Sequence, residues 1–415
     1  MYEVQQKGKL AKAASYQLNG ITTEEKNQAL QYIAEQLVQD KELILKENQK
    51  DLQEGENKGI SKAILDRIML DNTRIEVMYD AIFQLIDLND PIGEVLESLE
   101  KDNGLRMERK RVPIGVIGMI YEARPNVTID AATLSLKTGN AVILRGSSSA
   151  KYSNQALVAS IHQALAKSKL PVDAVQLIED TSRETAQQLF TLNEYLDVLI
   201  PRGGKKLIQS VLQSSTVPVI ETGAGNCHMF IDVSAEKNVA MRLVLNAKLQ
   251  RPSVCNTIES LLIHKDWFKE HGLVLLKALA EKQVVIFGDE NVCAVFSKAK
   301  QATEEDWYTE YLDLAISVKL VSSCEEAVNH INKYGTRHSE AIITTDYANA
   351  VYFQQHVDAA AVYHNASTRF TDGFEFGYGA EIGISTQKLH ARGPMGLPAL
   401  TSSKFYIYGQ GQIRE

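Results

Sequence analysis

A cysteine in a polar loop is the residue of this sequence best suited to covalent chemistry. Cys255 lies in the segment LQRPSVCNTIESLLIH, between a predicted helix that ends near Leu249 and a predicted strand that starts near Ile258. A loop thiol between two regular elements can face a binding cleft, where its thiolate would attack a carbonyl carbon. A buried structural cysteine is the alternative, and the residues alone leave the two interpretations evenly balanced.

An asparagine follows the longest apolar run of the first half of the chain. Asn126 stands in YEARPNVT, directly after IGVIGMIY at 114–121. An amide at the carboxyl end of a central strand can donate a hydrogen bond to a developing oxyanion. Taken alone, Asn126 is explained equally simply as the cap of the next helix, which is the commoner role.

Two further segments carry residues that bind phosphate groups in other proteins. Arg145 precedes a run of glycine and hydroxyls that includes Ser147 and Ser148, a composition that suits a phosphate monoester. This segment holds no acidic residue for ribose hydroxyls. Gly203 and Gly204 open a predicted helix, where a ligand could approach the backbone. A polar loop and a tight turn explain both segments without a ligand, and no G-x-G-x-x-G fingerprint occurs.

Strands and helices alternate over most of the chain. The first hundred residues indicate helices, with a capping box of Thr22 and Glu25. Strands are then predicted at 105–112, 114–121, 141–145, 175–179, 197–201 and 217–221, with helices at 128–138, 150–168, 182–192 and 203–213. A second set follows, with helices at about 235–249, 265–281, 324–334 and 346–356 and strands at 258–264, 315–321, 341–345 and 360–365. This alternation predicts an α/β fold with doubly wound sheets.

Composition and charge exclude several classes of protein. The net charge of −8 is spread along the chain, whereas a nucleic-acid surface needs a concentrated basic patch. No stretch approaches the roughly 18 apolar residues of a membrane span, and the N-terminus lacks the apolar core of a signal peptide. The four cysteines lie far apart without zinc-site spacing, so we predict no metal and a reducing compartment, the cytoplasm.

Seven segments, taken in order, resemble the aldehyde dehydrogenase superfamily, and within it the reductases of γ-glutamyl phosphate. They are VPIGVIGMIYEARPNVT, ILRGSSSA, IPRGGKKLI, IETGAGNCH, RPSVCNT, YHNASTRFTDGFEFGYGAEIGIST and HARGPMGL. The resemblance covers essentially the whole chain. It implies an aldehyde-dehydrogenase-like fold of two doubly wound α/β domains with a small oligomerisation strand element.

The resemblance also implies roles for single residues. Cys255 would be the nucleophile and Asn126 the side-chain donor of the oxyanion hole. Glu221 stands about 34 residues before Cys255, where many members of the superfamily have the base that activates water. Hydrolysis would waste an activated substrate, so we expect Glu221 to tune Cys255 or to position the nicotinamide instead. Glu310 is similar to the ribose-binding glutamate of the superfamily, in a looser sequence context.

The implied reaction is the NADPH-dependent reduction of L-glutamyl 5-phosphate to L-glutamate 5-semialdehyde, with release of phosphate, in proline biosynthesis. Arg145, Ser147 and Ser148 replace the superfamily's Lys-Pro-Ser-Glu type segment, and loss of its acidic residue favours NADPH over NADH. Gly203 and Gly204 would belong to the same cofactor site.

The substrate would be held by a second group of residues. Arg251 is a candidate for favouring the Cys255 thiolate or for holding the departing phosphate, and a surface ion pair explains it equally well. We expect the amino-acid head of the substrate at the loop of Ser367, Thr368 and Arg369.

The resemblance predicts three regions. Residues 1–100 and 112–231, with part of 375–400, would bind the cofactor, and 232–374 would form the catalytic domain that carries Cys255. Residues 101–111 and 401–415 would be oligomerisation strands of a homo-oligomer.

Three alternatives stay open. The first is an NAD-dependent hydrolytic semialdehyde dehydrogenase with Glu221 as the base. The second is a catalytically silent partner of glutamate 5-kinase, and the third is a CoA-dependent acyltransferase, for which we find no separate adenine-diphosphate site. The sequence does not decide whether glutamate 5-kinase docks to an active enzyme.

Overall fold

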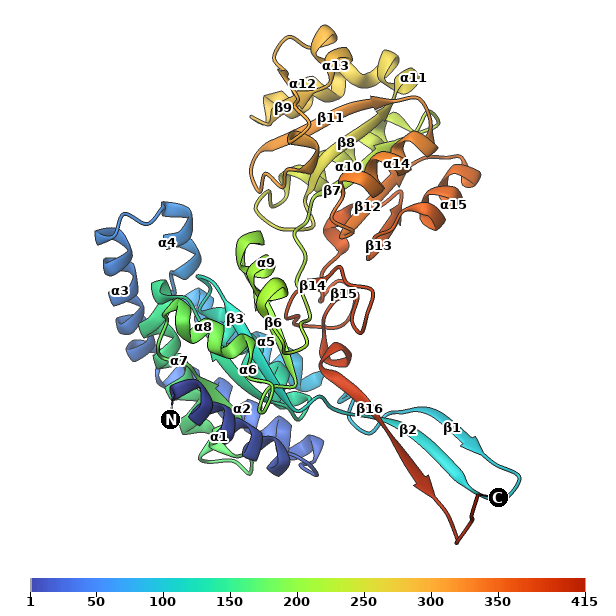
Figure 1. The fold of residues 1–415 in the computed structure, drawn as a ribbon. Helices are drawn as coiled ribbons and strands as arrows, with labels where there is room; N and C mark the ends of the chain where they lie inside the picture. The colour runs from blue at the N-terminus through green and yellow to red at the C-terminus, as the bar shows by residue number, and fades with distance from the viewer. Residues whose placement is uncertain (1, 415) are drawn as a thin grey trace. The chain divides into compact units, whose positions relative to one another are not determined.

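The computed structural model describes residues 2–414, and its contacts divide the chain into two compact units (Figure 1). The first unit is Met1–Thr222 with Gly377–Gly383 and Met395–Glu415, and the second is Gly223–Phe376 with Ile384–Pro394. The division falls nine residues before the expected one at 231/232, because strand β7 (Cys227–Ile231) pairs with strands of the second unit. Among the described residues, no helix is long and apolar enough to cross a membrane.

The first unit contains a four-stranded parallel sheet with the order β5-β4-β3-β6. Its strands are β3 (Val116–Tyr121), β4 (Ala141–Arg145), β5 (Val175–Leu177) and β6 (Val198–Arg202). Every residue of β3 is buried, as its continuous apolar run predicts for a parallel strand covered on both faces. The predicted strand at 217–221 is wrong, since only an isolated bridge joins Val219 to Leu199 there.

Helices surround this sheet in the order that the sequence indicates. They are α1 (Glu3–Gln17), α2 (Thr23–Gln39), α3 (Lys41–Asn57), α4 (Lys62–Ile68), α5 (Asn72–Asp87), α6 (Asn126–Lys137), α7 (Lys151–Leu165), α8 (Arg183–Phe190) and α9 (Lys205–Ser214). The predicted capping box is confirmed: the Thr22 hydroxyl accepts from the Glu25 N–H at 3.2 Å, and the Glu25 carboxylate accepts from the Thr22 N–H at 3.0 Å.

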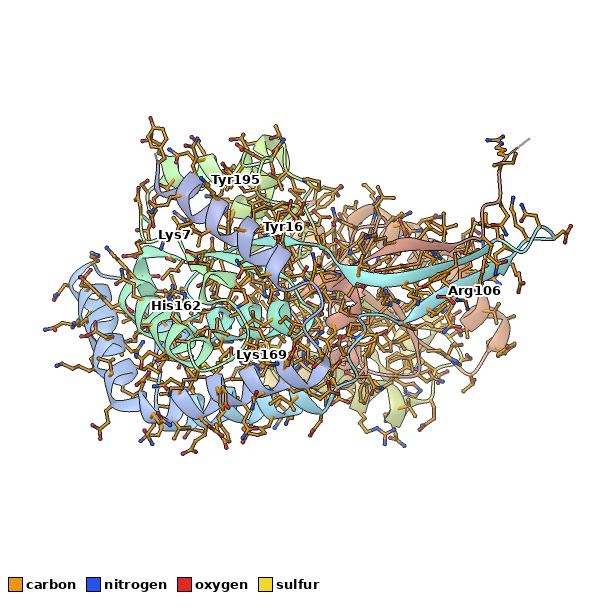
Figure 2. The ribbon with its side chains drawn as sticks, turned by 90° about the horizontal axis from the view of Figure 1, so that it is seen from below. Lys7, Tyr16, Arg106, His162, Lys169 and Tyr195 are labelled. Atoms are coloured by element: carbon orange, nitrogen blue, oxygen red, sulfur yellow. The ribbon has the colours of Figure 1, made fainter. Side chains whose placement is uncertain are left out.

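A three-stranded antiparallel sheet extends away from the rest of the first unit (Figure 1). It consists of β1 (Val95–Glu100), β2 (Arg106–Pro113) and β16 (Thr401–Tyr408). The sequence indicated β2 and the terminal strand, but β1 was missed because its glutamates, Glu97 and Glu100, are three residues apart, a spacing that also fits an exposed helix. The Arg106 guanidinium lies 4.6 Å from the ring centre of Tyr408 across this sheet (Figure 2).

The second unit is built on a seven-stranded parallel sheet with the order β10-β9-β11-β8-β7-β12-β13. Besides β7, its strands are β8 (Ile258–His264), β9 (Val285–Gly288), β10 (Lys300–Gln301), β11 (Ala315–Val321), β12 (Ser339–Ile343) and β13 (Ala361–His364). Two short strands, β14 (Ile384–Ser385) and β15 (Gly393–Pro394), pair separately. The sequence did not indicate β7, β9 or β10.

Helices cover both faces of this sheet, so successive residues of each strand enter different cores. Met229 and Ile231 pack in the larger core, whereas Phe230 between them packs in the smaller one. The helices are α10 (Lys237–Leu249), α11 (Lys265–Trp267), α12 (Leu273–Glu281), α13 (Glu290–Val295), α14 (Cys324–Tyr334) and α15 (Tyr347–His356). The expected helix at 265–281 is present with a π-helical turn at Phe268–Gly272.

Candidate functional site

The Cys255 loop, residues 250–257, connects α10 to β8 in the second unit, where the sequence placed it. Hydrogen bonds fasten this loop to the short helical turn η5 (Thr368–Phe370) and the residue after it. The Thr368 hydroxyl donates to the Asn256 carbonyl at 2.6 Å, and the Asn256 amide donates to the Thr371 carbonyl at 2.9 Å. The structure therefore brings together the two motifs from which nucleophile and substrate-binding residues were predicted.

A glycine lies directly against the backbone of Cys255. A Cβ on Gly225 would lie 1.6 Å from the Cys255 carbonyl oxygen. This distance is far below van der Waals contact, so only glycine fits here without a shift of the backbone. The Gly225 N–H donates to Glu310 Oε1 at 2.6 Å, so the predicted ribose-binding carboxylate also fixes the segment beside Cys255. The buried Cys227 thiol donates to the Cys255 carbonyl at 3.1 Å.

The four thiols differ in their environments. Burial raises the pKa of Cys227 well above its ordinary value and that of Cys324 to about 12. Burial also raises the pKa of Cys293, whose thiol donates to the Gly288 carbonyl at 3.4 Å. Cys255 is partly exposed. Cys293 is partly exposed as well, so exposure alone does not choose between these two thiols, and the role of Cys255 as nucleophile stays a prediction.

Arg369 is a cationic side chain whose charge interacts with that of Cys255. Burial lowers the pKa of Arg369, and the negative charge of a Cys255 thiolate opposes that shift. The attraction is mutual, so Arg369 favours the ionised form of Cys255. The Arg369 Nε–H donates to Gln250 Oε1 at 2.9 Å, which holds the guanidinium against the Cys255 loop. Arg251 is exposed on the same loop.

The other two predicted substrate-binding residues face inward. Ser367 and Thr368 are buried, and the Ser367 hydroxyl accepts from the Arg369 N–H at 3.3 Å while Thr368 binds the Asn256 carbonyl. Their hydroxyls thus shape the turn that presents Arg369. Contact of Ser367 or Thr368 with a substrate stays a prediction.

A buried ion pair that sequence reasoning missed supports both ends of the Cys255 loop. Lys248 at the end of α10 and Glu259 in β8 are 2.6 Å apart with no exposed side-chain surface. Glu259 also accepts from the Leu312 N–H at 3.1 Å. Burial raises the pKa of Glu259, and the Lys248 ammonium opposes this shift. Removing one partner of such a pair leaves a buried charge uncompensated.

In the first unit, Asn126 is the first residue of α6 and is exposed. The N-cap residue of this helix is Pro125, so the helix-cap alternative for Asn126 is wrong. The Asn126 amide donates instead to Asp130 Oδ2 at 3.2 Å, one turn further along the helix.

Beside Asn126 lies a cavity of about 50 Å³, here called the Asn126 cavity. It is lined by Met119, Arg124, Asn126, Val127, Asp130, Ala131, Arg202, Glu381 and Ile382. The cavity lies at the carboxyl ends of β3 and β6, two neighbouring strands of the sheet. The strand order reverses between these two strands, and open parallel sheets commonly bind ligands at such a point. Sequence reasoning missed Asp130, Arg202 and Glu381, since no pattern links the three segments.

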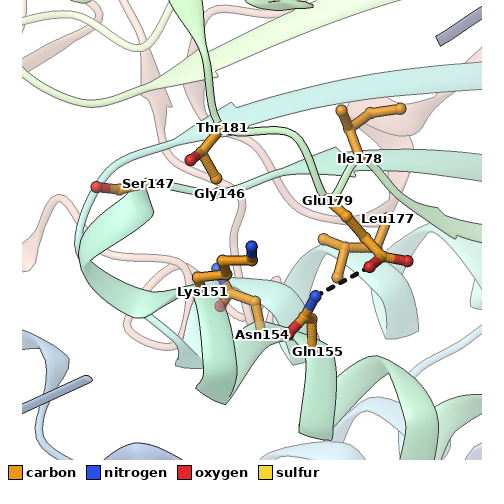
Figure 3. A pocket seen from close by; sticks show the side chains of 9 residues that line it. All are labelled: Gly146, Ser147, Lys151, Asn154, Gln155, Leu177, Ile178, Glu179 and Thr181. Carbon is orange, nitrogen blue, oxygen red and sulfur yellow. Dashed lines mark hydrogen bonds between the residues drawn. The ribbon is translucent and has the colours of Figure 1, made fainter. Parts of the chain in front are cut away.

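A second, smaller cavity lies at the carboxyl ends of β4 and β5 (Figure 3). Its lining residues are Gly146, Ser147, Lys151, Asn154, Gln155, Leu177, Ile178, Glu179 and Thr181. Ser147 is a predicted cofactor residue. Its hydroxyl also accepts from the Ser149 N–H at 3.2 Å, and the neighbouring Ser148 is exposed. Lys151 and Glu179, which the sequence did not single out, add a cation and a carboxylate to this cavity.

Arg145 has a different environment from the one expected. Its Nη2 donates to the backbone carbonyls of Thr181 at 2.6 Å and Ser182 at 3.0 Å. Burial lowers the pKa of Arg145, and Asp180 opposes this shift. The guanidinium thus joins the loops after β4 and β5, and binding of a phosphate by it stays a prediction.

The two glycines before α9 face a carboxylate of the protein. The Gly204 N–H donates to Glu122 Oε2 at 3.0 Å, and a Cβ on Gly203 would lie 2.7 Å from the Glu122 carboxyl carbon. The start of this helix therefore already holds an anion. Glu221 is half-buried in the segment after the isolated bridge at Val219, and its role stays a prediction.

The chain is similar in sequence and in structure to known proteins. Residues 2–312 match the model of the aldehyde dehydrogenase family. The chain is 64% identical over 415 residues to γ-glutamyl phosphate reductases of Oceanobacillus iheyensis and of Bacillus subtilis strain 168, covering all of each protein. Its structure is similar to the crystal structure of γ-glutamyl phosphate reductase from Thermotoga maritima, with a TM-score of 0.98, 47% identity and full coverage of both chains.

Proposed function

Because this chain belongs to the aldehyde dehydrogenase family, we propose that it reduces L-glutamyl 5-phosphate to L-glutamate 5-semialdehyde in proline biosynthesis. The observation that carries this proposal is the 64% identity, over the whole chain, to proteins named γ-glutamyl phosphate reductase. The chemistry of the described residues supports it, since a partly exposed thiol and a side-chain amide donor are both present.

Cys255 is the proposed nucleophile. Its thiolate attacks the γ-carbonyl carbon, forming a carbon–sulfur bond, and the carbonyl electrons move onto oxygen. Asn126 donates an N–H to that oxygen and stabilises the charge that develops there. When the carbonyl re-forms, the bond from carbon to the phosphate oxygen breaks, and a thioester and phosphate result. Arg251 and Arg369 are the proposed cations for the departing phosphate.

The residues around the smaller cavity of the first unit suit the adenosine end of a nicotinamide cofactor. Leu177 and Ile178 offer apolar walls, and Ser147 and Lys151 offer a hydroxyl and a cation for a 2′-phosphate. We propose NADPH as the cofactor, with Arg145 and Ser148 on the adjoining loop, Gly203 and Gly204 at the next strand end, and Glu310 at a ribose. When bound, NADPH supplies the hydride that reduces the thioester.

Glu221 is not a hydrolytic base in this proposal. Water attacks a thioester slowly without a base to deprotonate it, which protects the activated acyl group until reduction. Glu221 tunes Cys255 or positions the nicotinamide.

The proposal extends to the state of the protein in the cell. We place the enzyme in the cytoplasm as a homo-oligomer that uses the β1-β2-β16 sheet, on which Phe405 and Ile407 are each 60% exposed. Docking of glutamate 5-kinase would protect the labile acyl phosphate from water.

Running the reaction backwards tests the activity. Glutamate 5-semialdehyde, NADP and inorganic phosphate should yield NADPH and an acyl phosphate, which hydroxylamine traps as a hydroxamate. Free glutamate as the only product would show a hydrolytic dehydrogenase instead.

A further inference from the structure

The Asn126 cavity carries charged groups of both signs in equal number. Arg124 and Arg202 supply two cations, and Asp130 and Glu381 supply two carboxylates. We propose that this cavity binds the amino-acid head of the substrate, with Asp130 holding the α-ammonium and Arg202 holding the α-carboxylate. The proposal deepens the function above and rests on it, since only a substrate with a zwitterionic head needs such a site.

The arrangement of Asp130 and Arg202 favours a ligand between them. The positive charge of Arg202 opposes the effect of burial on Asp130, so the two groups sense each other's charge. Yet among the described residues they form no ion pair within 4.0 Å and no hydrogen bond. If the two groups served only to stabilise the fold, we would expect them to form a direct ion pair. A ligand with one positive and one negative group fills the gap between them with complementary charge at both ends.

Arg202 is also incompletely paired. Its Nε is buried and has no hydrogen-bond partner among residues 2–414. A Cβ on Gly383 would lie 2.9 Å from Arg202 Nη1, so the glycine at this position leaves room for the guanidinium. A buried donor without a partner costs free energy that a bound carboxylate would recover.

The position of Asp130 ties head-group binding to the reacting carbonyl. Asn126 and Asp130 are one helical turn apart and already share a hydrogen bond of 3.2 Å. The Asn126 amide nitrogen carries two hydrogens, so one can point to Asp130 while the other is donated to the oxyanion. In the substrate, three bonds separate the α-carbon from the γ-carbonyl carbon, a span of about 4 Å when extended. A head held at Asp130 thus leaves the carbonyl within reach of Asn126.

The cavity offers room and apolar walls for a bound group. Its volume of about 50 Å³ is several times what one water needs. Met119, Val127 and Ile382 give it apolar walls suited to the methylene groups of the substrate. If the head binds here, Ser367 and Thr368 are not needed to hold it, and their hydroxyls keep their contacts with the Arg369 N–H and the Asn256 carbonyl.

Four aldehydes test the proposal with the full-length enzyme, NADP and phosphate. Glutamate 5-semialdehyde has both charges, 4-aminobutanal lacks the carboxylate, 5-oxopentanoate lacks the ammonium, and butanal lacks both. A site built for a polar group rejects analogues that lack it strongly. We expect kcat/KM to fall at least about 100-fold on loss of either charge. Equal kcat/KM for all four aldehydes would overturn the proposal, whereas no phosphate-dependent turnover of the first would overturn the proposed function itself.

Two variants assign the charges. Asp130→Asn should lower kcat/KM at least about tenfold more for the two aldehydes with an ammonium than for 5-oxopentanoate and butanal, since any effect through the Asn126 amide is shared by all four. Arg202→Gln should lower kcat/KM at least about tenfold more for the two aldehydes with a carboxylate than for 4-aminobutanal and butanal. Asp80→Asn and Arg67→Gln change charge at exposed positions of the same unit and should affect none. A uniform loss with all four aldehydes would show that Asp130 or Arg202 only supports Asn126 or the fold, and would refute the assignment.

Discussion

The Cys255 loop and the Asn126 cavity use polar residues in opposite ways. Around Cys255, the side chains of Asn256 and Thr368 donate hydrogen bonds of 2.9 and 2.6 Å to backbone carbonyls. In the Asn126 cavity, Asp130 and Arg202 stand near each other without direct contact among the described residues. The first arrangement fixes the loop that carries Cys255, and the second leaves two opposite charges that we propose to be used by a ligand. A polar residue in a functional motif is therefore not evidence of ligand contact until its partners are known.

The largest expected effect concerns the nucleophile. Cys255→Ala should abolish turnover while cofactor binding and thermal stability stay close to those of the parent enzyme, because the covalent path is lost. Steady-state NADP reduction and a thermal melt would measure this. Cys293→Ala, a partly buried thiol of the same unit, is the matched control. Activity above a few per cent in Cys255→Ala would exclude Cys255 as the nucleophile.

Asn126 should give the next largest effect. Asn126→Ala should lower kcat by roughly 10²–10³, the usual cost of one oxyanion donor. Kinetics at saturating and limiting aldehyde separate kcat from KM. A change in KM alone would mean that Asn126 only positions the substrate.

The position of the Cys255 loop can be changed by a substitution outside the proposed catalytic residues. In Gly225→Ala the new methyl group meets the Cys255 carbonyl, so the loop must shift; we expect a loss of about 1–3 kcal/mol in stability and about tenfold in kcat. Denaturant unfolding and kinetics would show both. Gly204→Ala is the stability control, because the nearest atom to its Cβ is 3.7 Å away. Parent-like kcat in Gly225→Ala would show that loop position is not critical.

Substrate binding in the Asn126 cavity should depend on pH through Asp130. Burial raises the pKa of Asp130 to about 6, while Asn126 and Arg202 oppose that shift, and Arg124 and Glu381 also face the cavity. The carboxyl binds an ammonium only when ionised, so KM should be nearly constant between pH 7 and pH 8, where the substrate ammonium is still charged, and rise about tenfold between pH 7 and pH 5. The rise in KM below pH 7 should be absent in Asp130→Asn. If KM rose in the same way in that variant, the pH dependence would belong to another group.

Cofactor preference should give the smallest effect. Lys151→Ala should raise KM for NADPH a few-fold to about tenfold and leave NADH unaffected, since one cation near a phosphate is lost. Arg145→Ala should weaken both cofactors alike, because its guanidinium joins two loops through the Thr181 and Ser182 carbonyls. Selective loss of NADPH in Arg145→Ala would restore Arg145 as the phosphate ligand.

Local sequence signals predicted most of the fold, and their limits are physical. Continuous apolar runs marked buried strands such as β3, and the capping box marked the start of α2. The strand β7 was missed because its residues CHMFI include polar groups that become buried by pairing with distant strands. The segment 217–221 has strand composition but only one bridging partner.

The site shows the same division. Motif context singled out Cys255 and Asn126 as candidates, because each stands in a contiguous segment, and their catalytic roles stay predictions. It could not find Asp130, Arg202 and Glu381 as one cavity, since three separate segments supply them. It also could not show that Thr368 and Ser367 face inward, because their partners are backbone groups that only the folded chain brings near.

Counting turnovers without phosphate tests the central claim, a thioester on Cys255 that phosphate and not water resolves. The parent enzyme would be mixed with glutamate 5-semialdehyde and NADP in phosphate-free buffer, and NADPH would be measured per active site. Without an active base for water, we expect about one NADPH per Cys255 and then a stop, with continuous turnover once phosphate or arsenate is added. Steady turnover in phosphate-free buffer would contradict the account, because Glu221 would then be a working base and the protein a hydrolytic dehydrogenase.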